Sequence, residues 1–214
     1  MLDVTLAQIA GFLLAAFLVT LAPGPDNLSV LSLALSRGRR AGIGFGLGCA
    51  LGCFTHTVWA TLGVTALIAA SDTAFSALKF AGAGYLVWLG WQALRSPGAK
   101  FNAEAAGTPA PEPMRPYLMR GFVANAINPK VALFFLAFLP QFIDPARGHG
   151  AAQTALLGSL FAVQTVLVFG ALGYYAGTVG GWLRGRPAVG RWLDRATGGL
   201  FIGLGIRLAL AERG

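Results

Sequence analysis

Residues 19–31, VTLAPGPDNLSVL, interrupt the first long apolar run of the chain with two prolines, a glycine, an aspartate and an asparagine. Proline removes a backbone hydrogen-bond donor and ends or kinks a helix. A carboxylate in an apolar setting is costly unless it is paired, hydrated or protonated. The stretch therefore predicts a helix that is broken in its middle and carries polar groups at the break.

The composition is that of a multi-span membrane protein. Of 214 residues, 56% are hydrophobic and 11% are charged, and the mean hydropathy is +0.66, whereas about a quarter of the residues of a soluble domain are charged. The net charge of +8 lies between the apolar runs, which indicates membrane topology rather than binding of nucleic acid. No nucleotide loop or catalytic triad is present, so we expect no cofactor and no enzyme; an intramembrane enzyme is the alternative from another class.

The pattern predicts an all-α integral membrane protein with six transmembrane helices, of which the first and fourth are broken. A span needs about 20 apolar residues. The start of the chain lacks the basic segment of a secretory signal, so we expect it to be a retained span. The apolar runs cover residues 4–36, 41–71, 74–94, 117–142, 150–183 and 190–211.

The two halves of the chain resemble each other. Residues 42–63 are similar to 148–173, and 81–90 to 196–205. The whole chain then forms a single transport domain with repeat one at about 1–95, a linker at about 96–116 and repeat two at about 117–214. An odd number of spans in each half makes the second half inverted, and inverted repeats with paired broken helices are typical of transporters.

The loops alternate in charge along the chain. Basic residues gather at 37–40, 95–116 and 184–195, and basic loops favour the cytoplasm. This places both termini outside, on the side of the membrane opposite the cytoplasm. If the first run is a re-entrant segment, the N-terminus lies inside instead.

Asp26 is the candidate binding group of the first break. Pro25 suits the first position of a helix, so Asp26 and Asn27 fall in its first turn, where the helix dipole stabilises a carboxylate by roughly 0.3–1 kcal/mol. A charge at mid-membrane costs about 2.5–3.5 kcal/mol. Asp26 must therefore be protonated, hydrated or paired with a cation, and each case makes it a candidate for binding or proton coupling.

The second break, in residues 120–135, offers the opposite charge. Asn125 and Asn128 can satisfy backbone groups that Pro129 leaves free, and Lys130 is a lone ammonium in the fourth run. Lys130 could pair with Asp26, or the two could bind the carboxylate and ammonium of an α-amino acid. A plain kink with a capping aspartate, and a lysine that reaches the membrane surface, are the simpler alternatives.

The stretches LAPGPDN and GFVANAINPK, with the basic turn between them, resemble the lysine exporter / homoserine-threonine resistance (LysE/RhtB) family over nearly the whole chain. The resemblance implies a bacterial inner-membrane exporter driven by the proton gradient. Its cargo varies among amino acids and, in a relative, cadmium. The residues carried over from the two motifs are Pro23, Gly24, Pro25, Asp26, Asn27, Asn125, Asn128, Pro129 and Lys130.

Cys49, Cys53 and His56 lie on one face of the predicted second span. Such soft ligands suit zinc or cadmium, and heavy-metal efflux is therefore the alternative function, although packing is the better explanation of buried cysteines. His56 and Gln164 occupy matching positions in the two repeats. We expect these two side chains to line the transport pathway.

Small and aromatic residues predict how the helices pack. Glycines four residues apart, at 42/46, at 44/48/52 and at 173/177/181, suit close helix packing in lipid. Exposed faces of this kind are also compatible with a homodimer. We expect the aromatic side chains of FFLAFLPQF (134–142) to contact lipid or the membrane surface.

Overall fold

The computed structural model describes residues 4–64, 72–96, 113–184 and 186–210 of the 214-residue chain, and this part is helical throughout. Two helices, Arg39–Gly63 and Gly150–Tyr174, are long and apolar enough to cross a membrane, and the number rises to four if each of two bent helix pairs is one span. Most of the expected linker, residues 97–112, lies outside the described ranges. The elements are α1 (Leu6–Leu21), α2 (Pro25–Arg37), α3 (Arg39–Trp59), η1 (Ala60–Val64), α5 (Asp72–Arg95), α6 (Met114–Ala126), α7 (Pro129–Leu133), η2 (Phe134–Phe138), η3 (Leu139–Phe142), η4 (Pro145–Arg147), α8 (Gly150–Tyr174), α9 (Ala176–Arg184) and α10 (Pro187–Leu210).

The first predicted break is present between α1 and α2, which meet at a bend of 56°. α1 begins with a capping box in which Thr5 and Gln8 satisfy each other's backbone groups, an arrangement that fixes a helix start. Gly24 is the N-cap of α2 and Pro25 its first residue, as the preference of proline for this position predicts.

The second predicted break is present between α6 and α7, where the bend is 49°. Asn128 caps α7, because its Oδ1 accepts a hydrogen bond from the backbone N–H of Lys130 at 3.0 Å. Pro129 follows as the first residue of α7. The segment then continues through the π-helix η2 and the 3-10 helix η3.

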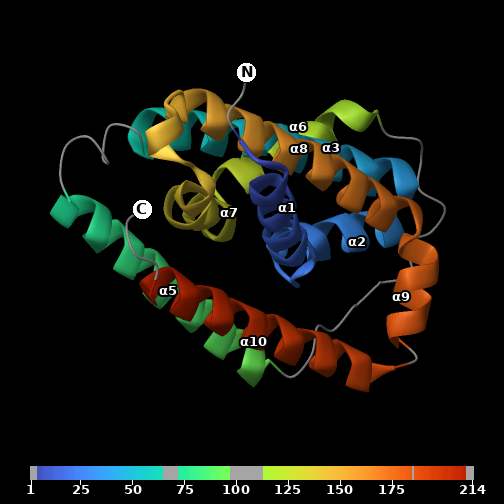
Figure 1. Cartoon of the computed structure of the whole chain (residues 1–214). Helices are drawn as coiled ribbons and strands as arrows, with labels where there is room; N and C mark the ends of the chain where they lie inside the picture. Colours follow the sequence, from blue (N-terminus) through green and yellow to red (C-terminus); the bar gives the residue numbers. More distant parts are fainter. Residues whose placement is uncertain (1–3, 65–71, 97–112, 185, 211–214) are drawn as a thin grey trace.

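α3 packs closely against its neighbours through glycines. α3, α6 and α8 run side by side in the upper part of Figure 1. A Cβ added at Gly48 would collide with the carbonyl oxygen of Leu118, and one at Gly121 with that of Phe45. The two backbones therefore approach more closely than alanine would allow, as the spacing of the glycines predicts for α3.

The expectation for the glycines at 173, 177 and 181 is only partly met. A Cβ at Gly173 would lie 3.0 Å from the backbone nitrogen of Ile43, whereas Gly177 and Gly181 have open space around them. The prediction was wrong for the last two because the helix bends at Tyr175, where α8 ends and α9 begins.

The aromatic segment after the second break forms the centre of the core, so the expected lipid contact was wrong. Phe134, Phe135 and Phe138 are at most 1% exposed. They pack with Phe12 of α1 and Phe161 of α8, with ring centroids 5.0–5.8 Å apart in the pairs 12–134, 134–138 and 135–161. Aromatic rings at these separations contribute packing energy beyond their area. An apolar ring fits lipid and core equally well, and the sequence pattern did not separate the two.

α5 and α10 form an antiparallel pair along the lower part of Figure 1. Their backbones touch at Gly90 and Gly198, since a Cβ at Gly90 would lie 2.6 Å from the carbonyl oxygen of Gly198. Near the end of α5, the Ser96 hydroxyl donates to the buried carboxylate of Asp194 at 2.5 Å. The pair joins the aromatic core through Leu86 and Phe201.

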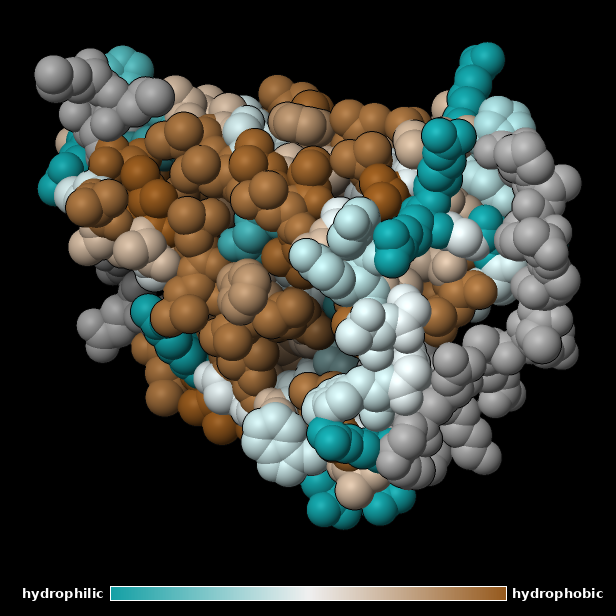
Figure 2. All heavy atoms as spheres, turned by 90° about the vertical axis from the view of Figure 1, so that its right-hand side faces the viewer, coloured by the Kyte–Doolittle hydropathy of each residue, from teal (hydrophilic) through white to brown (hydrophobic). Residues whose placement is uncertain are grey.

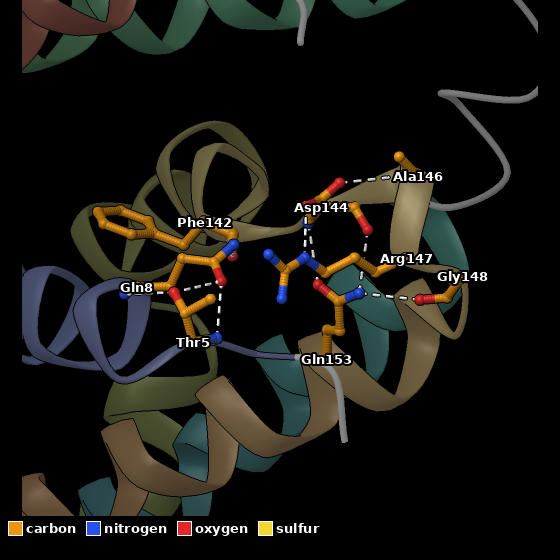
Figure 3. A network of polar contacts seen from close by, with 8 residues as sticks. All are labelled: Thr5, Gln8, Phe142, Asp144, Ala146, Arg147, Gly148 and Gln153. Carbon is orange, nitrogen blue, oxygen red and sulfur yellow. Dashed lines mark hydrogen bonds and ion pairs between the residues drawn. The ribbon is translucent and has the colours of Figure 1, made fainter. Parts of the chain in front are cut away.

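A polar network joins α1, η3 and the start of α8 (Figure 3). The Gln8 amide donates to the carbonyl of Phe142 at 3.3 Å. Gln153, which is fully buried, accepts from the backbone of Asp144 and donates to the carbonyls of Asp144 and Gly148, at 2.8–3.0 Å. This end of the helix bundle is therefore fastened by hydrogen bonds.

The surface is apolar over wide areas. Hydrophobic residues cover a broad part of the face shown in Figure 2. On α8, Val163 and Leu167 are 57% and 68% exposed, far more than large apolar side chains of a single soluble domain need be. Such a surface is suited to lipid.

Candidate functional site

The two helix breaks meet in the interior, where Asp26 and Asn125 are joined. Asn125, in the last turn of α6, donates from Nδ2 to Oδ2 of Asp26 at 2.9 Å. The two residues are 1% and 3% exposed. Asp26 stands in the first turn of α2, so the N–H groups and dipole of that helix also favour its negative charge.

Lys130 reaches across from the second break to the first. Its Nζ donates to the carbonyl oxygens of Val19 and Ala22 at 3.2 and 3.1 Å, and the residue is 7% exposed. These carbonyls lie at the end of α1, where the last carbonyls of a helix have no partner within it and the dipole favours a cation. Lys130 thus caps a helix other than its own.

Gly24 makes this reach possible. A Cβ at Gly24 would lie 2.8 Å from the ammonium nitrogen of Lys130. Any larger residue would move the ammonium away from the carbonyls of α1. The glycine of the Pro-Gly-Pro motif therefore provides room for a charged group and does not merely allow a turn.

The two charges hold equivalent positions in the two breaks. Pro25 and Pro129 are each the first residue of their helix, and Asp26 and Lys130 are each the second. In the described part of the chain, the hydrogen-bond partners of these charges are an amide and two carbonyls rather than each other. Both side chains line the same cavity.

Asn27 of the first break and Asn128 of the second each have one buried side-chain amide atom without a partner. Asn27 donates to the carbonyl of Thr20 at 2.6 Å but leaves its Oδ1 unbonded. Asn128 uses its Oδ1 as a cap and leaves its Nδ2 unbonded. A buried unpaired polar atom costs about 1–3 kcal/mol. Each asparagine lies within two residues of Asp26 or Lys130 in the sequence, but neither is among the residues that line the cavity the two charges share.

The cavity between the breaks is small. It has room for about one water molecule, which is less than an amino acid needs. The helices must move apart before a solute of that size can enter. Its lining consists of Val19, Thr20, Asp26, Asn125, Lys130, Val131, Phe161, Thr165 and Phe169.

The sequence matches a known protein family. The LysE type translocator family matches residues 17–212. The chain belongs to this family. It is therefore a membrane transporter and not an enzyme. No solved structure matches it.

Three relatives cover almost the whole translocator. An uncharacterized membrane protein of Vibrio cholerae is 34% identical over 94% of this chain and 96% of its own. The homoserine/homoserine lactone efflux protein of Salmonella typhimurium is 32% identical over 94% and 95%. The leucine efflux protein of Enterobacter sp. is 29% identical over 92% and 93%.

His56 and Gln164 stand behind the cavity of the translocator. Nε2 of His56 lies 2.8 Å from the carbonyl oxygen of Asn125. A carbonyl only accepts, so we assign the proton of the ring to Nε2. The Gln164 amide donates to the Thr20 hydroxyl at 3.4 Å. Both side chains bond to residues that line the cavity and are not themselves among those residues.

The cysteines of α3 serve packing and hydrogen bonding. The single S–H of Cys53 can donate to the carbonyl of Cys49 at 3.3 Å, and the sulfur also lies 3.6 Å from Oδ1 of Asn125 and 3.9 Å from the Thr165 hydroxyl. In the ranges that the structure describes, no three His, Cys, Asp or Glu side chains are grouped to hold a metal ion. Together with the efflux relatives, this geometry does not favour the heavy-metal alternative.

The residues of α8 that line the cavity were not predicted from the sequence. Phe161, Thr165 and Phe169 all line the cavity. They are four residues apart, so they share one face of a helix. That spacing was a usable signal, but apolar residues surround it on every side of α8 and hide the face that points inward.

Proposed function

We propose that this translocator is a secondary active, proton-coupled exporter of amino acids or close derivatives across the bacterial inner membrane. The observation that carries the proposal is the meeting of the two helix breaks at one cavity whose buried lining includes a carboxylate, Asp26, and an ammonium, Lys130. Two relatives are named a homoserine/homoserine lactone efflux protein and a leucine efflux protein, and these names support the substrate class.

The proposal includes six spans arranged as an inverted three-plus-three repeat. The equivalent positions of Asp26 and Lys130, each after a proline that starts a helix, support this relation. In such transporters the site lies near the midplane and the repeats rock around it. The small cavity then corresponds to a closed state, and rocking opens it to one side at a time.

Asp26 is the group that couples transport to protons in this scheme. When the cargo is bound, the carboxylate faces the ammonium of the amino acid. When the cargo has left, a proton takes the place of its ammonium on the carboxylate and crosses inward with the empty site. Asn27 and Asn128 do not line the closed cavity; in this scheme their free Oδ1 and Nδ2 atoms bond to the amino and carboxylate groups of the cargo once the helices have moved apart.

We assign the basic segments to the cytoplasm and both termini to the periplasm. Arg39 stacks on Tyr174, Arg95 on Trp91 and Arg186 on Trp182, with 4.4–5.1 Å from each guanidinium to its ring centroid. Arginines and aromatic rings gather at membrane–water boundaries, which supports one boundary at this end. A homodimer is compatible with the exposed apolar helices but is not needed by the site.

The test is transport by purified protein in liposomes. Vesicles are loaded with labelled amino acids, the outside is made acidic, and efflux is measured for the wild type, for Asp26→Asn and for Asp144→Asn. Asp144 is the matched control, because it is a carboxylate in the loop before α8, paired with Arg147. We expect proton-driven efflux to fall at least about tenfold in Asp26→Asn alone. An unchanged proton-driven rate in Asp26→Asn would remove Asp26 from the coupling.

A further inference from the structure

The cavity contains one negative and one positive side chain. Of the eight acidic residues in the sequence, those at 26, 144 and 194 have described side chains, and Asp26 alone of these three lines the cavity. Lys130 is the one basic residue among the described lining residues. The charges of the site thus sum to zero when both groups are ionised.

Lys130 is a fixed charge rather than a mobile one. Two carbonyl oxygens at 3.1 and 3.2 Å hold its ammonium, and Gly24 leaves just enough room for it. The side chain is buried, so water does little to screen its field. A cationic group that enters the cavity must therefore come close to a positive charge that has no easy way to withdraw.

The rest of the lining carries no charge. Val19, Val131, Phe161 and Phe169 supply apolar walls. The Thr165 hydroxyl donates to the carbonyl of Phe161 at 2.9 Å, and its oxygen can still accept from a hydroxylated cargo. No described lining residue other than Asp26 could neutralise a second cation.

We propose that the site selects amino acids whose side chains are uncharged, aliphatic or hydroxylated, and that Lys130 is the residue that excludes basic ones. This inference rests on the proposed function. A zwitterion with a neutral side chain leaves the sum of charges at zero. A lysine or arginine cargo adds a positive charge that lies near Lys130 and has no carboxylate of its own.

The size of the effect follows from the interaction of two like charges in a partly buried site. At the effective dielectric of such sites, this repulsion reduces binding by on the order of 10- to 100-fold. Removal of the Lys130 charge should restore much of this roughly 10- to 100-fold loss in the binding of basic cargo. It should not help neutral cargo in the same way, so the ratio of the two rates is the informative quantity.

The experiment compares leucine, homoserine and lysine in the efflux assay, with the wild type, Lys130→Gln and Lys130→Arg. For the wild type we expect leucine or homoserine efflux at least about tenfold faster than lysine efflux. In Lys130→Gln the ratio of lysine to leucine efflux should rise about tenfold or more. Lys130→Arg keeps the charge and should keep the wild-type ratio.

Binding is measured in parallel from the thermal stability of the purified wild-type protein, because a ligand that binds the folded state raises its melting temperature. We expect neutral amino acids to raise it and lysine to leave it unchanged. This arm needs no variant, so the selectivity is testable even if Lys130→Gln does not fold.

The outcomes separate this inference from the proposed function. Wild-type efflux and binding of lysine equal to those of leucine would overturn the charge selection alone. An unchanged lysine-to-leucine ratio in a folded Lys130→Gln would overturn the role of Lys130. Binding of neutral but not basic amino acids without any efflux would support the selection and overturn the export function. No binding and no efflux of any amino acid would overturn both.

Discussion

Gly24 shows how a single residue can matter through a neighbour. The nearest atom to a Cβ at this position is the ammonium nitrogen of Lys130, at 2.8 Å. That nitrogen ends a flexible side chain and can move, but it then loses two carbonyl partners. The residue is therefore required for the placement of a charge more than for the course of the backbone.

We expect Gly24→Ala to reduce efflux strongly and to lower the free energy of unfolding by about 1–2 kcal/mol, since a buried ammonium loses part of its hydrogen bonding. Gly84→Ala is the matched control, because a Cβ at Gly84 has open space. Efflux from liposomes and thermal unfolding in detergent measure the two effects. Equal behaviour of the two variants would contradict this role for Gly24.

Asn125 connects more groups than any other residue at the break. Its amide bonds to Asp26 and Cys53, and its carbonyl lies 2.8 Å from Nε2 of His56. We expect Asn125→Ala to destabilise the fold by about 1–3 kcal/mol, because a buried carboxylate loses its donor. Unfolding of the double variant Asn125→Ala/Asp26→Asn checks the cause. The loss should be smaller in the Asp26→Asn background, and equal losses would show that the bond to Asp26 is not responsible.

At the scale of whole helices, glycine sets the distance between α3 and α6. We expect Gly48→Ala to be less stable than Gly170→Ala by about 1–3 kcal/mol, the usual cost of overpacking. Both changes add one Cβ to a helix and gain the same helix propensity, but only the Cβ at Gly48 collides with a carbonyl, that of Leu118. Thermal unfolding of the two variants measures the difference. A Gly48→Ala protein as stable as the control would mean that the helices can separate at little cost.

Helix boundaries were predicted best where the sequence contains helix-breaking prolines. Pro25 and Pro129 mark both helix breaks, because proline constrains the chain whatever surrounds it. The burial of the residues 134–142 was predicted wrongly, because lipid and protein core are alike in polarity. The hydrogen-bond partners of Lys130 could not be predicted either. They are carbonyls at the end of α1, which come near Lys130 only when the two breaks meet in the folded chain.

At the scale of the molecule, the proposed topology puts the two ends of the bundle on opposite sides of the membrane. In a variant with both cysteines replaced by serine, we expect Ala146→Cys to react with an impermeant maleimide in intact cells with a permeable outer membrane. Arg40→Cys should react only after the inner membrane is opened. Both positions are exposed, so reactivity reports sidedness rather than burial. The reverse pattern would place the basic turn outside.

The small cavity has a consequence for the cell as well as for the cargo. A space for about one water molecule is too short for a file of waters, and the ring of Phe161 in its lining packs on the buried ring of Phe134, with the centroids 5.4 Å apart. We therefore expect the resting protein to act as an electrical insulator. Cells that produce it in quantity without cargo should keep their membrane potential, and the proposed coupling would use the proton gradient only when cargo is exported.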